Sequence, residues 1–338
     1  MTSSRAWFVD RVGGPERLVL RERPDPVPGE GDVLVRTAAI GLNFADLFVR
    51  AGAYPRTPVP PFVPGMEISG TVEAVGRGVG DLAPGRRVAA VPIFGGHAEK
   101  VVLPAARVFP LPDGADLAEA AAMPVVFLTA WYALRETRVD RGDRVVVTAA
   151  AGGVGTALLQ MCRLRGAPCL ALAGSAGKLA LCRELGARAA GTYGDAEALL
   201  ASVFGGKADV VIDAVGGRLF RRLWRRLDRD GRYALYGFAA ASGERGVAKL
   251  KAIFELAAMG LVLPYAFVQP CRTLTGFNLS LLADRTDVLR SAAAEIFDLW
   301  KSGQVRPILG PTFDFAHLPD AHRALAGRGT TGKVVITI

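Results

Sequence analysis

TAAAGGVG, residues 148–155, contains seven small residues, one valine and no charge. The residues before it, RVVVTA, form a short apolar run rich in valine, which predicts a buried strand. The residues after it, TALLQMCRLRGA, carry apolar side chains at helical spacing as far as Gly166. A strand–turn–helix unit with so little side chain at the turn indicates that something must come very close to this backbone.

Ala150, Gly152 and Gly155 match the fingerprint of a dinucleotide-binding turn, with alanine in place of the first glycine. In that fingerprint the first small residue permits the tight turn, the second lets a pyrophosphate approach the backbone, and the third lets the helix pack on the strand. The amides at the start of the helix then face the phosphate. We therefore expect a dinucleotide here. Because the motif alone is weak, a Gly-rich turn with a purely structural role is the alternative.

Strand and helix patterns alternate regularly from Arg144 to Asn278, with six short strands in that region. Residues before Asp116 read as short strands cut by Pro and Gly, and residues 117–136 are helical in period. After Asn278 the pattern gives a helix, a strand pair and a last strand, KVVITI, which suggests a return to the first domain. The regular alternation predicts a parallel sheet with helices on both faces.

The end of the second predicted strand, LALAGSAGK, bears on the choice of nucleotide. An NAD-binding chain usually shows Asp or Glu about 20 residues after the glycines, to hold the ribose hydroxyls. Here Gly174, Ser175 and Lys178 stand in that region, and a hydroxyl with an ammonium suits the 2′-phosphate of NADPH. The alternative for Lys178 is an ordinary exposed helix lysine. Tyr193, at the end of the third strand, would stack on the adenine edge or merely close the sheet.

Length and composition restrict the class of protein. The 338 residues are enough for two domains, and 51% hydrophobic with 22% charged residues suits a globular protein. The four cysteines form no CxxC pair, which favours a reducing cytosol over a disulfide or zinc framework. The net charge is +9, and its densest basic run is RRLWRR, residues 221–226, for which a solvated helix face is the plain interpretation. The most apolar window, residues 252–268, is expected to be a buried helix followed by an apolar loop because it is short for a membrane span.

Four segments, GLNFADLFVRAGAYP, FVPGMEISGTVEAVG, TAAAGGVG and TTGKVVI, together resemble the medium-chain dehydrogenase/reductase superfamily over essentially the whole chain. The chain is most similar to the zinc-independent quinone oxidoreductase branch, which includes zeta-crystallin and the vesicle amine transport protein 1 homologues. The resemblance implies an α/β fold in two domains. A split, β-rich, GroES-like catalytic domain is expected over residues 1–123 and 279–338, around an inserted Rossmann domain, a doubly wound parallel sheet, over residues 124–278.

The residues at the zinc positions depart from the zinc alcohol dehydrogenases of this superfamily. Those enzymes carry Cys where this chain has Asn43 and His where it has Met66, and they also carry a lobe of four close cysteines that is missing here. Asn and Met are poor zinc ligands, so the resemblance implies that no metal is bound. His97, His317 and His322 show no ligand spacing and are expected in structural or surface roles.

The resemblance also implies the catalytic residues. Tyr54 and Asn43 would line the nicotinamide and substrate site, Tyr54 to hydrogen-bond or protonate an enolate, Asn43 to hold the ribose or the substrate oxygen. The alternatives are that Asn43 only braces a loop and that Tyr54 only packs beside Pro55.

Further cofactor-binding positions follow from the resemblance. They are Asn43, Thr129, Ala151, Gly152, Gly153, Val154, Val215, Tyr236, Phe238, Phe277, Asn278 and Lys333. The segment LVLPYAFVQP, residues 261–270, is expected to wall an apolar, cyclic substrate beside Tyr54, with the side chains Leu261, Leu263, Tyr265 and Phe267. The alternative is that these side chains pack a dimer interface.

These expectations combine into one function. Without a Lewis acid a simple ketone is hard to reduce, whereas a conjugated acceptor spreads the charge to an oxygen that a few donors stabilise. We expect a zinc-independent, cytoplasmic, NADPH-dependent reductase of an enone or quinone, such as a tailoring enoyl reductase, that forms a homodimer through its edge strand CRTLTGFNL. The alternative is an NADPH-binding interaction protein, associated with RNA or membrane, with little turnover. Only the RRLWRR run and the apolar window favour it.

Overall fold

A computed structural model describes residues 2–241 and 247–338 of the chain. The backbone divides into two compact units, Met1–Leu128 with Ser280–Ile338, and Thr129–Leu279. Each unit has its own sheet and its own hydrophobic core.

The second unit contains a six-stranded sheet in which every neighbouring pair of strands is parallel. Its strands are β8 (Val145–Thr148), β9 (Cys169–Ala173), β10 (Ala189–Thr192), β11 (Ala208–Asp213), β12 (Leu227–Leu235) and β13 (Thr273–Gly276). The spatial order is β10-β9-β8-β11-β12-β13, so the direction of winding reverses between β8 and β11. This is the Rossmann order, and the predicted parallel sheet is confirmed.

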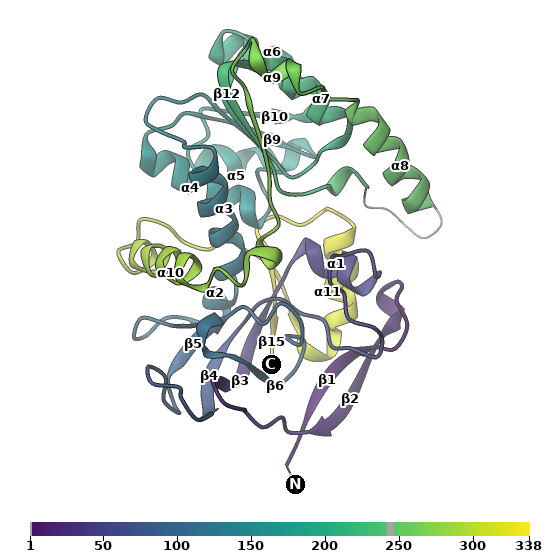
Figure 1. The fold of residues 1–338 in the computed structure, drawn as a ribbon, viewed down its shortest axis with the longest axis vertical. Helices are drawn as coiled ribbons and strands as arrows, with labels where there is room; N and C mark the ends of the chain where they lie inside the picture. The colour runs from purple at the N-terminus through teal and green to yellow at the C-terminus, as the bar shows by residue number, and fades with distance from the viewer. Residues whose placement is uncertain (1, 242–246) are drawn as a thin grey trace. The chain divides into compact units, whose positions relative to one another are not determined.

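Helices connect these strands and cover both faces of the sheet (Figure 1). They are α3 (Pro124–Glu136), α4 (Gly153–Arg165), α5 (Leu179–Glu184), α6 (Ala196–Phe204), α7 (Gly217–Arg226), α8 (Val247–Met259) and the single turn α9 (Tyr265–Val268). Leu200 of α6 and Phe220 of α7 belong to one buried cluster with the strands, which places these two helices on the same face. Helix α4 ends where predicted, at Gly166, whose φ of 68° gives the left-handed cap that glycine adopts without strain.

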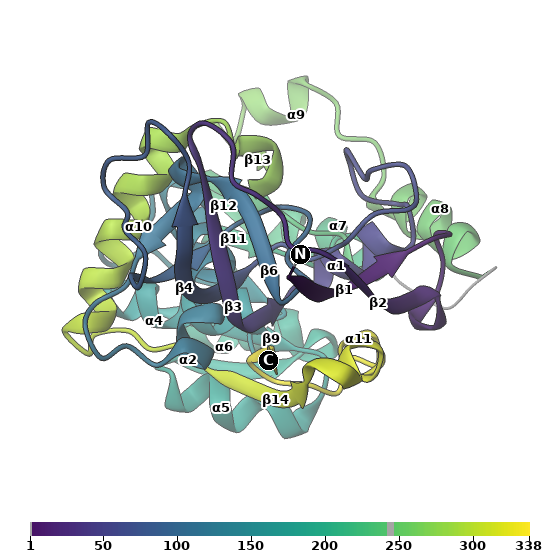
Figure 2. The same cartoon turned by 90° about the horizontal axis from the view of Figure 1, so that it is seen from below.

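The first unit is built mainly from antiparallel strands, which confirms the β-rich expectation for the first part of the chain. One sheet has the order β14-β15-β3-β4-β5-β7 with β6 beside β3, and β1 and β2 form a separate pair (Figure 2). The bounds are β1 (Ser3–Val9), β2 (Leu18–Pro24), β3 (Asp32–Leu42), β4 (Ile68–Val75), β5 (Arg87–Ala90), β6 (Lys100–Pro104), β7 (Val108–Pro110), β14 (Leu309–Asp314) and β15 (Lys333–Thr337).

The end of the chain completes this first sheet, as the sequence predicted. Strand β15 pairs with β3 on one side and with β14 on the other. The helices of this unit are α1 (Phe44–Arg50), α2 (Leu117–Ala121), α10 (Thr286–Lys301) and α11 (Leu318–Ala326). Short 3-10 turns occupy Pro15–Arg17, Ala105–Arg107, Ala176–Lys178, Tyr193–Asp195, Ala239–Ala241, Leu279–Leu282 and Phe315–His317.

Three local predictions were wrong. The helical stretch 117–136 is two helices, because Pro124 lacks an N–H and disfavours helical backbone in the residue before it. The strand pair expected before KVVITI is one strand, β14, followed by helix α11. An apolar–polar pattern as short as LPDAHRALA does not by itself separate helix from strand.

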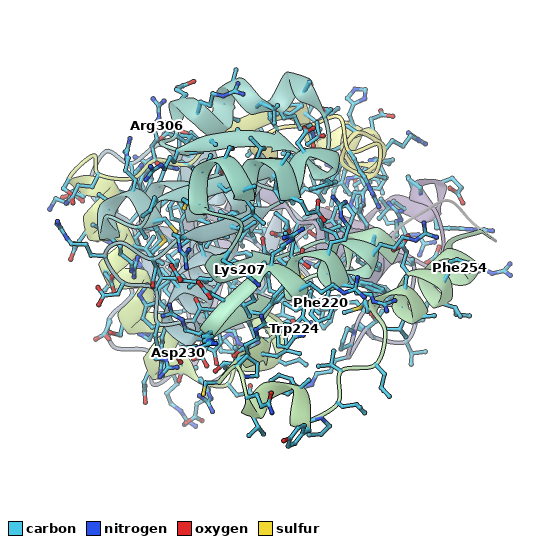
Figure 3. The ribbon with its side chains drawn as sticks, turned by 90° about the horizontal axis from the view of Figure 1, so that it is seen from above. Lys207, Phe220, Trp224, Asp230, Phe254 and Arg306 are labelled. Atoms are coloured by element: carbon cyan, nitrogen blue, oxygen red, sulfur yellow. The ribbon has the colours of Figure 1, made fainter. Side chains whose placement is uncertain are left out.

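The third wrong prediction concerns the apolar window 252–268, which was expected to be buried. Ile253, Phe254 and Leu256 of α8 are 65%, 64% and 62% exposed, because α8 packs on α7 and on the turn Ala239–Ala241, which leave these side chains uncovered. Figure 3 shows Phe254 on the outer part of α8, away from Phe220. Within the described ranges, no helix has the length and apolar character needed to cross a membrane.

Candidate functional site

The amino end of α4 lies directly after the small-residue turn. Gly152 is its N-cap and provides no side-chain hydrogen bond, and the first turn holds no acidic residue. The amides of Gly153, Val154 and Gly155 therefore have no acceptor within the helix. A Cβ on Gly155 would lie 2.4 Å from the Ala149 carbonyl oxygen, so only glycine lets the helix approach the turn this closely. These features fit a bound pyrophosphate.

The tight turn begins one residue earlier than the fingerprint suggests. Ala149 adopts the left-handed conformation, with φ of 49°, whereas Ala150, at the first fingerprint position, is fully buried. A non-glycine residue in this conformation is uncommon and costs free energy, so the fold holds it there.

The cofactor residues predicted in the second unit gather at one edge of the sheet, the edge formed by the carboxyl ends of its parallel strands. Because all six strands are parallel, the segments that follow their last residues meet at that edge. These segments contain Ala151, Gly152, Gly153 and Val154 after β8, Gly174, Ser175 and Lys178 after β9, Tyr193 after β10, Val215 after β11, Tyr236 and Phe238 after β12, and Phe277 and Asn278 after β13. Thr129 lies outside these segments, in α3, and is 7% exposed.

Asp213, the last residue of β11, lies at the same edge and was not singled out from the sequence. Its carboxylate is fully buried and accepts hydrogen bonds from the Thr148 hydroxyl (2.7 Å), the Tyr233 hydroxyl (2.7 Å), and the amides of Val215 (2.8 Å) and Gly216 (3.1 Å). Burial raises the pKa of Asp213, while the four donors oppose that shift. The only sequence signal was a lone acid at the end of an apolar strand.

Aromatic rings line the same edge beside Asp213. The ring of Tyr236 stacks on Phe277 with centroids 5.9 Å apart, and Phe277 also packs on Tyr132 at 4.9 Å. Burial, followed by the nearby Asp213 carboxylate, raises the pKa of Tyr236. A Cβ on Gly216 would lie 2.7 Å from the ring of Phe238, so this glycine makes room for Phe238.

The residues after β9 and β10 also come together. A Cβ on Gly174 would lie 3.9 Å from the Tyr193 ring, so Tyr193 packs beside the segment that holds Ser175. Ser175 is exposed, and Lys178 is half-buried with its pKa lowered by that burial. This corner can offer a hydroxyl, an ammonium and an aromatic ring to one ligand.

The predicted substrate residues of the second unit differ in their surroundings. Leu261, Leu263 and Tyr265 are 86%, 57% and 69% exposed. Phe267 packs edge-on against Trp224 of α7, with centroids 5.3 Å apart (Figure 3 shows Trp224 beside Phe220). That packing accounts for Phe267 without a ligand, and the substrate role of these residues stays a prediction.

In the first unit Asn43, Glu67 and Lys333 form a buried polar cluster. They stand at the end of β3, before β4 and at the start of β15, which are neighbouring antiparallel strands whose ends share one edge. The Lys333 ammonium donates to Asn43 Oδ1 (2.6 Å) and pairs with Glu67 Oε2 (2.5 Å). The Asn43 amide nitrogen donates to Glu67 Oε2 and to the Gly41 carbonyl, both at 3.2 Å. Both amide hydrogens of Asn43 are thus engaged, whereas Lys333 keeps a third N–H beyond these two bonds.

Asp46 is a second buried acid beside this cluster. It accepts a hydrogen bond from the backbone N–H of Asn43 (2.8 Å), and the capping box of α1 explains its place at the third helical position. Burial raises the pKa of Asp46 to about 7, against the opposing effects of the Asn43 amide and Lys333. When Asp46 is protonated, the cluster contains one positive charge, on Lys333, and one negative charge, on Glu67. These two charges balance, which lowers the cost of burying them.

Tyr54 makes a hydrogen bond within the first unit. Its hydroxyl donates to Ser280 Oγ at 3.0 Å, and its ring packs against the hydrophobic core of the unit. Ser280 was not singled out from the sequence, because 226 positions separate it from Tyr54.

The histidines were expected in structural or surface roles. His97 and His322 are fully buried with rings 5.3 Å apart, and the Arg50 guanidinium contacts His322 Nδ1 at 2.9 Å. His317 is on the surface beside Asp320. Across residues 2–241 and 247–338, no three His, Cys, Asp or Glu side chains form a group that could hold a metal ion.

Comparison with known proteins identifies the family. Residues 29–113 match the alcohol dehydrogenase GroES-like domain, and residues 185–336 match the zinc-binding dehydrogenase domain. A quinone oxidoreductase of Pseudomonas aeruginosa is 34% identical over 331 residues, which cover 96% of both proteins. The chain belongs to the medium-chain dehydrogenase/reductase superfamily.

Two further relatives place it within that superfamily. The synaptic vesicle membrane protein VAT-1 homolog of Danio rerio is 31% identical, over 98% of this chain and 70% of that protein. The quinone oxidoreductase of Thermus thermophilus, solved also in complex with NADPH, has a TM-score of 0.82 and 36% identity, with 99% of this chain and 100% of that chain covered. This medium-chain dehydrogenase/reductase is therefore an oxidoreductase of the quinone oxidoreductase group, and the predicted family and fold class are confirmed.

Proposed function

We propose that the protein is an NADPH-dependent reductase of enones or quinones that works without a metal. The observation that carries the proposal is the amino end of α4, where no side chain accepts from the first amides. It lies at the sheet edge where the other predicted cofactor positions gather. NADPH, when bound, supplies a hydride to the acceptor. The amides of Gly153 and Val154 would hold its pyrophosphate, and Ser175 with Lys178 would hold its 2′-phosphate.

The chain's own residues favour a conjugated acceptor. Asn43 and Met66 occupy the positions of zinc ligands in related alcohol dehydrogenases, and neither is a good zinc ligand. The acceptor must then spread negative charge through conjugation. Tyr54 would hydrogen-bond or protonate the oxygen where this charge collects. Because the Asn43 amide is fully engaged, Lys333 is the better donor to a ribose hydroxyl, and Asn43 holds Lys333 in place.

A panel of enones and quinones tests this proposal, each assayed with NADPH and with NADH in the presence of EDTA. We expect turnover of at least one conjugated acceptor, a preference for NADPH and no loss with EDTA. Turnover that EDTA abolishes and zinc restores would show the mechanism to be wrong, as would oxidation of simple alcohols only.

We also propose that the protein is a homodimer in the cytoplasm. Strand β13 is an outermost strand of the second sheet and pairs with β12 alone among the described strands. Its Leu274 is 36% exposed, and exposed edge strands favour pairing with a second copy.

A second candidate function is favoured by the surface of α7. Arg218, Arg221, Arg222 and Arg225 line a hollow of about 390 Å³ together with Ala258 of α8. Such a basic surface suits an acidic partner, an RNA strand or an anionic membrane, as the interaction protein would require. Salt-sensitive binding to single-stranded RNA or anionic vesicles, lost in R218E/R221E/R225E, with no turnover in the panel above, would favour this function over the reductase.

A further inference from the structure

Asp213 joins the two strands at the point where the winding of the sheet reverses. Thr148 is the last residue of β8 and Asp213 the last of β11, and these strands are neighbours in the sheet. The Thr148 hydroxyl donates to Asp213 Oδ1 at 2.7 Å, and its oxygen accepts the Ala214 amide at 2.9 Å. One buried contact thus holds the starts of two edge segments, the small-residue turn after β8 and the loop after β11.

The same carboxylate fixes the loop after β11 directly. Its Oδ1 accepts the Val215 amide and its Oδ2 accepts the Gly216 amide. The loop after β11 is also hydrogen-bonded to the segment after β12. The backbone amides of Ala239 and Ala240 donate to the carbonyls of Ala214 and Val215, at 3.0 and 2.9 Å. Asp213 therefore sets the position of three segments at the edge where the dinucleotide is proposed to bind.

Four donors converge on the two oxygens of this carboxylate. An uncharged amide at this position would present an NH₂ group to one backbone N–H, whichever way it turned. Hydroxyl groups can rotate, but the amides of Val215 and Gly216 cannot, so one of them would lose its acceptor. The position thus requires a carboxylate and not merely a polar side chain of this size.

We propose that Asp213 is a positioning residue for dinucleotide binding, which acts through the loops after β8 and β11 without touching the ligand. This inference rests on the proposed NADPH-dependent function. It assigns a role to a buried acid that lies outside the fingerprint and whose two oxygens accept four hydrogen bonds from the chain itself.

Two variants and a matched control test it. D213N leaves the shape of the side chain, and T148V removes the hydroxyl that links the two loops. L200A removes a fully buried side chain of α6 in the same core and serves as the control for lost stability. NADPH affinity is measured by fluorescence titration, the unfolding midpoint by urea, and the exchange rates of the Val215 and Gly216 amides by hydrogen exchange.

We expect D213N to weaken NADPH binding about tenfold or more and T148V to weaken it to a lesser degree. L200A should lower the unfolding midpoint but leave the affinity of the folded protein within about twofold of the wild type, because it removes none of the hydrogen bonds that hold the two loops. In D213N one of the two loop amides should exchange faster, which a loss of global stability alone does not single out.

The inference is wrong if D213N and T148V bind NADPH as the wild type does, or if L200A loses affinity in proportion to its loss of stability. Should D213N fail to fold, T148V decides by the same criteria. A wild-type protein that binds neither NADPH nor NADH would instead contradict the proposed function itself.

Discussion

The Lys333 ammonium lies 2.5 Å from the Glu67 carboxylate, and both side chains are buried, 4% and 0% exposed. Glu67 Oε1 also accepts the Val125 amide at 2.6 Å, at the start of α3. Glycine at position 41 makes this approach feasible, since a Cβ there would lie 2.8 Å from Glu67 and 2.9 Å from Lys333. Lys333 and Glu67 therefore form a buried ion pair at the same strand ends as Asn43.

Replacement of Lys333 should destabilise the protein strongly. K333M leaves the Glu67 carboxylate buried without its counter-ion, which costs about 3–5 kcal/mol of unfolding free energy. Urea denaturation measures this, and the double variant K333M/E67Q should recover part of the loss. R5A, which breaks the exposed Arg5–Glu99 pair, should cost less than about 1 kcal/mol and is the control. Equal losses in K333M and R5A would contradict the importance of this buried pair.

The buried histidines should make the protein sensitive to acid. Burial, and then the Arg50 charge, lowers the pKa of His97 to about 3, and burial with His97 and Arg50 lowers that of His322 well below its ordinary value. Below a pH of about 6.5 the unfolded chain binds these protons and the folded chain does not. As the pH is lowered through this range, the unfolding free energy should fall by up to about 1.4 kcal/mol per pH unit for each histidine.

Asp46 opposes this slope. Its pKa is raised to about 7 in the folded protein, so between pH about 4 and 7 the folded chain binds a proton that the unfolded chain does not. Asp213, whose pKa burial also raises, adds to this opposition. The net slope between pH about 4 and 6.5 should then be shallower than that of two histidines. Urea midpoints over this range should show a shallower slope in H97F and an unchanged slope in H317N, whose histidine is exposed. A slope in H97F as steep as the wild type's would show that His97 is not buried neutral.

Lys178 should discriminate between the two dinucleotides. A charge-assisted bond to the 2′-phosphate is worth roughly 1.5–3 kcal/mol, so K178A should weaken NADPH binding about ten- to a hundredfold and leave NADH nearly unchanged. Lys207 stands before β11, at the amino ends of the parallel strands and not at their carboxyl ends, and K207A is the matched control. Parallel losses for NADPH and NADH in K178A would mean that Lys178 does not bind the phosphate.

Tyr54 should affect turnover more than binding. Y54F removes the hydroxyl proposed to stabilise the reduced acceptor and should lower kcat on the order of a hundredfold, with little change in NADPH affinity. S280A removes the partner of that hydroxyl but keeps the hydroxyl itself, so kcat should fall far less. Steady-state kinetics with the best acceptor of the panel measure both variants. A Y54F enzyme with wild-type kcat would leave Tyr54 only its packing role.

The edge strand should control assembly. Light scattering at micromolar concentration should give a dimer, and L274K, which places a charge on the exposed edge of β13, should shift it towards monomer. T312K on β14, the edge strand of the first unit's sheet, is the control and should remain dimeric. A monomeric wild type would remove the dimer proposal.

The sequence by itself determined the order of elements in the second unit and the edge of the sheet at which the predicted cofactor positions meet. Glycine and valine patterns marked six strands, and parallel strands place their carboxyl ends together whatever the remaining contacts are. Local chemistry also fixed the end of α4 at Gly166. These features depend on residues close in the chain, so a pattern is enough to predict them.

Only the tertiary structure decided which polar side chains meet. Asn43 and Lys333 are 290 positions apart, and Asp213 reads in sequence as one acid after an apolar strand. Their roles arise from burial, which makes an unpaired charge or amide costly and so forces each to find a partner. The sequence likewise did not decide the exposure of α8, because an apolar helix is buried only where neighbours cover it, and the neighbours of α8 leave Ile253, Phe254 and Leu256 exposed.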